Sequence, residues 1–154
     1  MRAALAVGVL SAAGVLVGLQ PAGAASNTVL AEDSTSHFEV KPSVIGYTGD
    51  ATGYLGKRTW GAMRGYLKWT RWNSYSASGV GTVWLNNCRP SCSNGGWSSR
   101  KGWVQLGAPK RGKFTVMTIT YRRGDRMVSD TRRIRHVPKD RFSDGYWIWT
   151  ILNR

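Results

Sequence analysis

Two cysteines, Cys88 and Cys92, are the residues of this chain whose type and spacing most directly suggest chemistry. They lie in the stretch WLNNCRPSCSNGGW, residues 84–97, with three residues between them. A structural zinc site needs four ligands, and the two histidines of the chain, His37 and His136, are both far away in sequence. A thioredoxin-type redox centre has two intervening residues at the start of a helix, and no helical pattern follows here. We therefore predict a disulfide that closes a turn at Arg-Pro-Ser, with no bound metal and no cofactor.

The N-terminus has the pattern of a secretory signal peptide, residues 1–25. Arg2 precedes an uncharged stretch rich in Ala, Val, Leu and Gly, and small residues lead to cleavage after Ala24 or Ala25. The alternative is a membrane anchor, because the stretch approaches the roughly 20 residues that span a bilayer. Its weak apolarity and Pro21 favour the signal peptide. We expect a secreted protein, extracellular or associated with the cell wall, with no stable membrane span after processing, and an oxidising compartment favours the disulfide.

The chain that remains after processing is strongly basic. It has 129 residues (154 minus 25), which suits one domain, and 21 Lys and Arg against 8 Asp and Glu. Residues 26–40 are polar and acidic without a sustained apolar period, so we predict a flexible acidic leader before a β domain at 41–154. A polycation concentrates near anionic polymers, with an affinity that falls as salt rises. Solubility alone is the other explanation of the charge, and composition does not choose between the two.

The elements that must position these residues are predicted to be strands. Runs of aromatic and β-branched residues alternate with stretches rich in Gly, Ser and Pro, and no window of helical length has an apolar stripe at helical spacing. We therefore expect an all-β fold, a single compact antiparallel sandwich or barrel. A hairpin turn is predicted at 123–125, and the predicted strands cover 66–72, 80–86, 103–106, 114–121, 126–137 and 146–152.

Three short motifs carry a resemblance to a known family. They are Trp-Thr-Arg-Trp at 69–72, Ala-Ser-Gly-Val-Gly-Thr at 77–82, and the cysteine block at 86–95. Together they resemble small secreted actinobacterial proteins of unknown function with the pattern WxxW, AxGxG and NxCxPxC. The resemblance covers roughly residues 66–121, and the chain has Ser93 where that family usually has Ala. It implies secretion and brings no established activity.

Eight tryptophans are distributed along the chain, and most are expected in the core because each buries a large area. Trp69 and Trp72 are three residues apart, which predicts opposite faces of a regular strand and hence some exposed aromatic surface. Trp97 follows two glycines just past the cysteines, so we predict an exposed ring that stacks on a sugar or a partner. A core position is the alternative for each of the eight, Trp60, Trp69, Trp72, Trp84, Trp97, Trp103, Trp147 and Trp149.

A cluster of arginines is the densest charge feature, and we predict binding roles for Arg122, Arg132, Arg133 and Arg135. The guanidinium group is a planar fork that suits phosphate and carboxylate, and Arg outnumbers Lys fourteen to seven after residue 25. On a strand, Arg133 and Arg135 would share one face about 7 Å apart, near the spacing of successive backbone phosphates. The alternative is an edge strand protected from aggregation by charge.

Catalytic groups are scarce in the predicted domain. No Glu follows Glu39, and His136 is the one histidine after residue 40. A glycosidase needs two facing carboxylates, and a serine hydrolase of the common elbow type needs Gly-x-Ser-x-Gly, which is absent from the sequence. The aspartates that could serve all lie among Arg or Lys, namely Asp125, Asp130, Asp140 and Asp144. We therefore do not expect an enzyme.

The sequence as a whole favours a secreted, non-catalytic binding module. The preferred ligand is an anionic polymer of the cell envelope or surroundings, a polysaccharide or a phosphate polymer. Nucleic acid stays among the candidates, although no nucleic-acid-binding motif accompanies the arginines. The main alternative is an effector or inhibitor that presents the cysteine loop to a protein partner of unknown identity, and the least favoured is a small hydrolase centred on His136.

Overall fold

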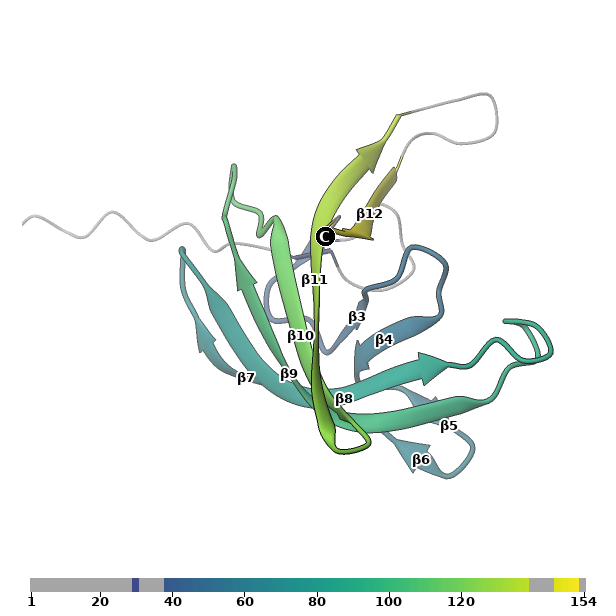
Figure 1. Ribbon diagram of the computed structural model, residues 1–154. Helices are drawn as coiled ribbons and strands as arrows, with labels where there is room; N and C mark the ends of the chain where they lie inside the picture. The colour runs from purple at the N-terminus through teal and green to yellow at the C-terminus, as the bar shows by residue number, and fades with distance from the viewer. Residues whose placement is uncertain (1–28, 31–37, 139–145, 153–154) are drawn as a thin grey trace, which may run out of the picture.

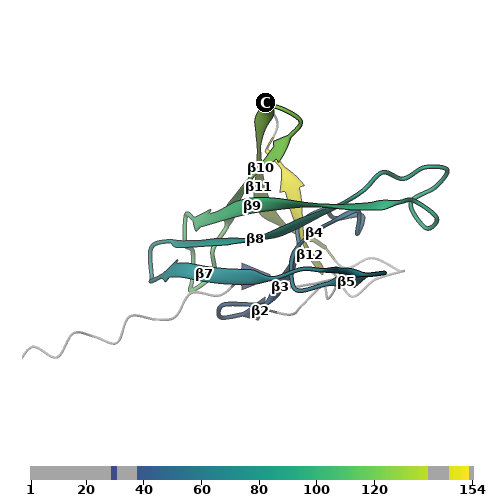
Figure 2. The ribbon, with the colours of Figure 1, turned by 90° about the horizontal axis from the view of Figure 1, so that it is seen from below.

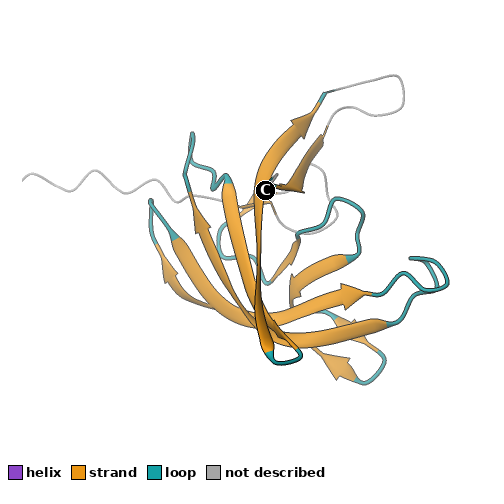
Figure 3. Ribbon diagram, in the orientation of Figure 1, coloured by secondary structure: helices purple, strands orange, loops and turns teal. Residues whose placement is uncertain are grey.

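The computed structural model describes residues 29–30, 38–138 and 146–152, and within them it contains strands, turns and loops but no helix (Figure 3). The prediction of an all-β fold is confirmed. The predicted signal peptide lies outside the described residues. The strands are, in chain order, β1 (Val29–Leu30), β2 (Phe38–Glu39), β3 (Val44–Gly46), β4 (Gly53–Gly56), β5 (Thr59–Trp60), β6 (Met63–Arg64), β7 (Leu67–Trp72), β8 (Ala77–Asn86), β9 (Trp97–Gly107), β10 (Val116–Arg123), β11 (Arg126–Val137) and β12 (Tyr146–Ile151).

Eight of these strands form one antiparallel sheet that curls into a half-barrel (Figure 1). The strand order is β12-β11-β10-β9-β8-β4-β3, and β7 also pairs with β8. β8 and β9 pair from Ala77 opposite Leu106 to Asn86 opposite Trp97. The other edge of β8 is shared, because its first half pairs with β7 and its second half with β4. Figure 2 shows how far the resulting β8–β9 hairpin extends beyond the other strands.

Small residues on β8 let β7 lie close against it. A Cβ atom at Gly79 would lie 2.9 Å from the Lys68 carbonyl oxygen, and one at Gly81 would lie 3.1 Å from the Leu67 Cα. Both glycines are buried. The sequence of this segment, rich in Gly and Ser, is typical of a loop. It forms a strand because it pairs with β7 on one side and with β9 on the other. β8 therefore begins at Ala77, three residues before the predicted start at Val80.

The inner face of the half-barrel carries the hydrophobic core. Buried side chains alternate along β9 and β10, as expected for strands with one covered face, and Phe114 and Trp149 add large rings from outside these two strands. The buried cluster consists of Ile45, Tyr47, Leu55, Ala77, Val83, Val104, Leu106, Phe114, Met117, Ile119, Tyr121 and Trp149.

A second aromatic layer lies on the outer face of the sheet. Trp84 is 1 % exposed, and its Nε1 donates a hydrogen bond to the Gly56 carbonyl at 3.0 Å. The Trp97 ring contacts the rings of Tyr54 and Trp60, with centroids 5.7 Å apart in each pair. Tyr54 pairs with Trp84 across β4 and β8, so these residues share one side of the sheet. We call Tyr54, Trp60, Trp84 and Trp97 the outer aromatic cluster.

Trp69 and Trp72 contact each other, so the prediction that they point to opposite faces is wrong. The register between β7 and β8 shifts between Trp69 and Arg71, because these two residues face consecutive residues of β8 and Thr70 between them is extra. Such a β-bulge reverses the alternation of side chains beyond it. The two indole rings meet edge to face with centroids 4.6 Å apart, and Trp72 also packs edge-on against Phe114 at 5.5 Å.

Packing contacts reach into the segment predicted to be a flexible leader. β1 pairs with β2 in a small sheet of its own. Phe38 of β2 packs against the core, and its ring meets the Trp147 ring edge to face with centroids 6.3 Å apart. The packed structure therefore begins before Lys41, the predicted start of the domain.

Candidate functional site

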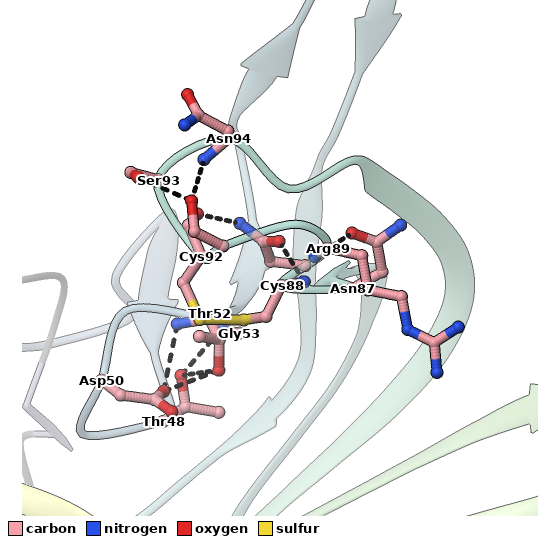
Figure 4. Close-up of a disulfide and its surroundings, with 12 residues drawn as sticks. Thr48, Asp50, Thr52, Gly53, Asn87, Cys88, Arg89, Cys92, Ser93 and Asn94 are labelled. Carbon is pink, nitrogen blue, oxygen red and sulfur yellow. Dashed lines mark hydrogen bonds between the residues drawn. A yellow bond between two sulfur atoms is a disulfide. The ribbon is translucent and has the colours of Figure 1, made fainter.

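Cys88 and Cys92 form a disulfide in the loop that joins β8 to β9, as predicted (Figure 4). Asn86, the last residue of β8, forms hydrogen bonds to both ends of this loop. Its Oδ1 accepts a hydrogen bond from the Cys88 amide at 2.8 Å, and its Nδ2 donates to the Cys92 carbonyl at 2.8 Å. Arg89 to Asn94 are all exposed. The disulfide and Asn86 together stiffen a loop that projects into solvent.

A polar turn at 48–53 lies beside the disulfide loop (Figure 4). The Asn86 amide donates to the Thr52 carbonyl at 2.9 Å, which joins the two segments. Asp50 Oδ1 accepts from the Thr52 hydroxyl at 2.6 Å and from the Thr52 amide at 3.2 Å. Burial raises the pKa of the Asp50 carboxyl, but hydrogen bonds from Thr52 and Thr48 outweigh burial and hold the pKa below its usual value of 3.8. The charged carboxylate therefore supports the turn at neutral pH.

A concentration of cations surrounds a cavity at the opposite end of β9 from the disulfide loop. A cavity of about 510 Å³ lies between the loop that precedes β10 and the strand β11. Four of its nine lining residues are cations, and the described lining contains no carboxylate. We call this cavity the basic pocket, and its lining consists of Ala108, Lys110, Arg111, Lys113, Thr115, Val116, Arg133, Ile134 and Trp147.

A tight turn supplies three of these cations. Lys110 and Lys113 exchange two backbone hydrogen bonds, of 2.8 and 3.0 Å. The two residues between them, Arg111 and Gly112, have φ angles of 49° and 72°. Positive φ at both central positions is the conformation of a type I′ turn, for which Gly at the second position is favourable. The turn thus brings three cations together within four residues.

Two aromatic rings contact the ammonium group of Lys113. Lys113 Nζ lies 4.8 Å from the centroid of the Phe38 ring and 5.8 Å from that of Trp147. An ammonium group over ring faces is attracted by their π electrons. Trp147 also contacts the His136 ring, with centroids 4.8 Å apart. The pocket therefore combines a fixed ammonium group with an apolar surface.

Arg133 is the predicted binding residue that lines the basic pocket. It pairs with Thr150 of β12, and Arg135 pairs with Ile148 two positions farther along. Both arginines are exposed, and their spacing places them on one face of β11, as predicted. Arg135 lies outside the lining of the pocket.

Arg122 is exposed at the other end of the sheet. It pairs with Met127 next to the β10–β11 turn, whereas Arg133 pairs with Val116 at the start of β10. The six positions between Val116 and Arg122 correspond to about 20 Å along a strand. Arg122 therefore cannot act in the same pocket as Arg133.

Arg132 is a buried structural cation, in contrast to the binding role predicted for it. It is 8 % exposed, and its Nη2 and Nε donate to Asp130 Oδ2 at 2.7 and 3.0 Å. Its guanidinium carbon lies 5.3 Å from the centroid of the Tyr47 ring. Burial raises the pKa of the Tyr47 phenol, so this neighbour stays neutral. Successive side chains of a strand point to opposite faces. Arg132 therefore faces the core, whereas its neighbour Arg133 faces outward.

Trp97 is half-buried in the outer aromatic cluster, so its ring is less exposed than we predicted. Trp60 and Trp103 are the more exposed tryptophans, at 49 % and 44 %. Trp97 also lies far from Arg133. Val116 pairs with Arg133 on one side and with Gly107 of β9 on the other, so Arg133 lies level with Gly107. Gly107 is ten positions along β9 from Trp97. Ten positions correspond to about 30 Å. The structure does not bring the predicted arginines together beside Trp97.

The cations and the aromatic ring of the lining that the sequence did not mark as binding residues are Lys110, Arg111, Lys113 and Trp147. The sequence does contain a signal for these cations, because Pro-Lys-Arg-Gly-Lys at 109–113 places three of them within four residues at a turn. The sequence does not show that β11 and β12 lie beside this turn, and that placement makes the pocket.

Comparisons with protein-family models, with curated proteins and with solved structures found no match for this chain. Within the described ranges, no group of three or more His, Cys, Asp and Glu side chains could hold a metal ion. The same ranges contain no helix that is long and apolar enough to cross a membrane.

Proposed function

We propose that the protein is an exported, non-catalytic module that binds an anionic polymer of the cell envelope or surroundings, a polysaccharide or a phosphate polymer, at the basic pocket. The observation that carries this proposal is the lining of the pocket, which combines four cations with an aromatic ring and no described carboxylate. Arg133 supplies a planar fork for phosphate or carboxylate, and Lys110 and Lys113 supply compact charges. A partly enclosed site strengthens such contacts because it excludes water.

Exposed cations at the mouth of the pocket and beyond it support a polymer in preference to a small anion. Arg111 lines the pocket and is exposed, and Arg135 is exposed outside the lining, where it continues the line of Arg133 at about 7 Å. A chain that places one anionic group in the pocket can place the next groups on these side chains. The net charge of +14 adds long-range attraction for any polyanion.

The chemistry of the lining supports binding without catalysis. Thr115 contributes a hydroxyl group, but that hydroxyl already donates to the Ala108 carbonyl at 2.5 Å. General acid–base catalysis needs a group that exchanges protons near neutral pH, such as a carboxyl or an imidazole. The described lining contains neither a carboxyl nor an imidazole group, and its charged groups are all cations.

The test compares two arginines on the same face of the same strand, one inside the pocket and one outside. Binding of long-chain polyphosphate and of heparin is measured by calorimetry over a series of salt concentrations. Arg133→Ala should weaken binding about tenfold, since a hydrogen bond to a charged group contributes about 1.5–3 kcal/mol. It should also lower the slope of log K against log salt by about one.

Arg135→Ala is the matched control, because it removes the same charge from the same strand. It should weaken binding less than Arg133→Ala. Equal losses in the two variants would show that only total charge matters and would overturn the proposal. Dissociation of both polymers from the unmodified protein below physiological salt would overturn it as well.

A further inference from the structure

A second cavity, of about 360 Å³, lies near the disulfide loop and shares no lining residue with the basic pocket. Two arginines line it, Arg100 of β9 and Arg123 of β10. Tyr121 pairs with Gly102, and each arginine lies two positions beyond that pair on its own strand. Both side chains therefore extend to the same, inner side of the sheet, past Tyr121 at the end of the core.

The strand pairing brings like charges together at this position. Arg123 lies directly opposite Arg126 across the β10–β11 hairpin. Like charges directly opposite each other destabilise a sheet. The described lining of the cavity contains no carboxylate, so an anion that neutralises these arginines has to come from outside the lining. Arg100, Arg123 and Arg126 are all exposed, so solvent screens part of their repulsion, and a bound anion would remove more of it.

The disulfide loop adds a fixed hydrogen-bond donor. Asn87 lines the cavity, and its Oδ1 accepts from the amides of Arg89 at 3.0 Å and Gly96 at 2.9 Å. Because both bonds use the oxygen, the NH₂ group of Asn87 is left to donate elsewhere. Arg100 is fixed in a similar way, since its Nη1 donates to the Ser99 carbonyl at 2.8 Å and its other N–H groups stay available.

We propose that this cavity binds a terminal phosphate group on a small organic molecule, with Arg100, Arg123 and the Asn87 amide as donors. A phosphate monoester carries nearly two negative charges at neutral pH, which matches two guanidinium groups, and its three oxygens accept several hydrogen bonds. Leu85 and the Tyr121 ring line the same cavity and provide an apolar wall for the organic part. We call it the inner-face arginine site, and it does not depend on the function proposed for the basic pocket.

The test is an NMR titration of the protein with phenyl phosphate, with benzoate as a ligand of the same ring and a single negative charge. The side-chain amide of Asn87 and the backbone amide of Gly102 should shift with phenyl phosphate. Arg123→Ala should weaken this binding at least tenfold. Arg122→Ala is the matched control: it removes the same charge from the next position of β10, on the outer face, and should change the affinity less than twofold.

Two further variants test the loop. Asn87→Asp keeps an oxygen for the amides of Arg89 and Gly96 but replaces the donor with a negative charge, so it should abolish the titration. Cys88→Ser with Cys92→Ser should weaken phenyl phosphate several-fold and leave the Arg133-dependent binding of polyphosphate unchanged, which also shows that the variant is folded. Unchanged binding in Asn87→Asp, or equal losses in Arg122→Ala and Arg123→Ala, would overturn the proposal. Benzoate binding as tightly as phenyl phosphate would overturn the assignment to phosphate.

Discussion

At the scale of single residues, arginines close together in the sequence have different roles. Arg132 and Arg133 are neighbours, yet Arg132 is 8 % exposed and bound to Asp130, whereas Arg133 is exposed and lines the basic pocket. Successive residues of a strand point to opposite faces, so one arginine of the pair is inside and the other outside. A count of cations in the sequence therefore overstates the number available to a ligand.

We predict that Arg132→Ala destabilises the protein by about 3 kcal/mol. Removing one partner of a buried ion pair leaves the other charge without compensation. The side chain of Asp130 is 22 % exposed, so water relieves only part of the cost. The measurement is urea denaturation at neutral pH, with Arg133→Ala as the control, which should stay within about 0.5 kcal/mol of the unmodified protein. A loss below about 1 kcal/mol for Arg132→Ala would contradict the structural role.

At the scale of elements, the disulfide loop depends on one glycine as well as on its sulfur bridge. Gly95 is buried, and a Cβ atom there would collide with the Asn86 side-chain oxygen and lie 2.8 Å from the Cys88 amide nitrogen. At Gly96 the nearest atom would be the Asn87 side-chain nitrogen, at 3.3 Å. The two adjacent glycines therefore tolerate a methyl group very differently.

We predict that Gly95→Ala lowers stability by about 1–3 kcal/mol, because the added methyl group forces backbone and side chain apart in a packed loop. Gly96→Ala should have a clearly smaller effect, since its nearest contact, at 3.3 Å, needs a shift of only a few tenths of an ångström and leaves the hydrogen bonds of Asn87 in place. Thermal unfolding of the oxidised proteins measures the difference. Equal effects at the two positions would show that the loop is not held as described.

Most strands could be predicted from sequence, because aromatic and β-branched runs bounded by turns carry a local signal. The prediction for 126–137 matches β11 (Arg126–Val137), and the turn before it is correct. The bulge in β7 could not be predicted, because the extra residue, Thr70, becomes visible only against the register of β8. β9 begins at Trp97, six residues before the predicted Trp103, since its polar first half is a strand through pairing with β8.

The candidate site was predictable only in part, for the same physical reason. Arg133 and its exposure follow from charge and alternation along one strand. The pocket itself needs the turn at 110–113, β11 and Trp147 of β12 to meet, and this is a matter of tertiary packing. The Trp97 ring is less exposed than expected because a short hairpin, β5–β6, places Trp60 against it. Local sequence does not reveal which segment covers which face.

At the scale of the whole molecule, the two cationic cavities lie toward opposite ends of β10. Val116 at its start lines the basic pocket, and Arg123 at its end lines the inner-face arginine site. Seven positions correspond to about 23 Å along a strand. Two sites this far apart, with no shared lining residue, should bind short ligands independently of each other. Changes in binding free energy caused by variants at the two sites should therefore add. Long-chain polyphosphate is different, because one protein can hold one chain in the basic pocket and the terminal phosphate of a second chain in the inner-face arginine site.

We predict that the protein cross-links long-chain polyphosphate and that light scattering detects the network, whereas phenyl phosphate gives none. Cross-linking needs both sites, so Arg123→Ala or Arg133→Ala should each suppress scattering while the remaining site still binds. Arg122→Ala should scatter like the unmodified protein, and Arg135→Ala should scatter clearly more than Arg133→Ala, because Arg135 lies outside the lining of the pocket. All four variants have the same formal net charge, +13 (14 minus 1), so a difference among them reports where the charge lies and not how much there is. If the four variants scatter alike, bulk charge neutralisation drives the association and the molecule has no bivalent geometry.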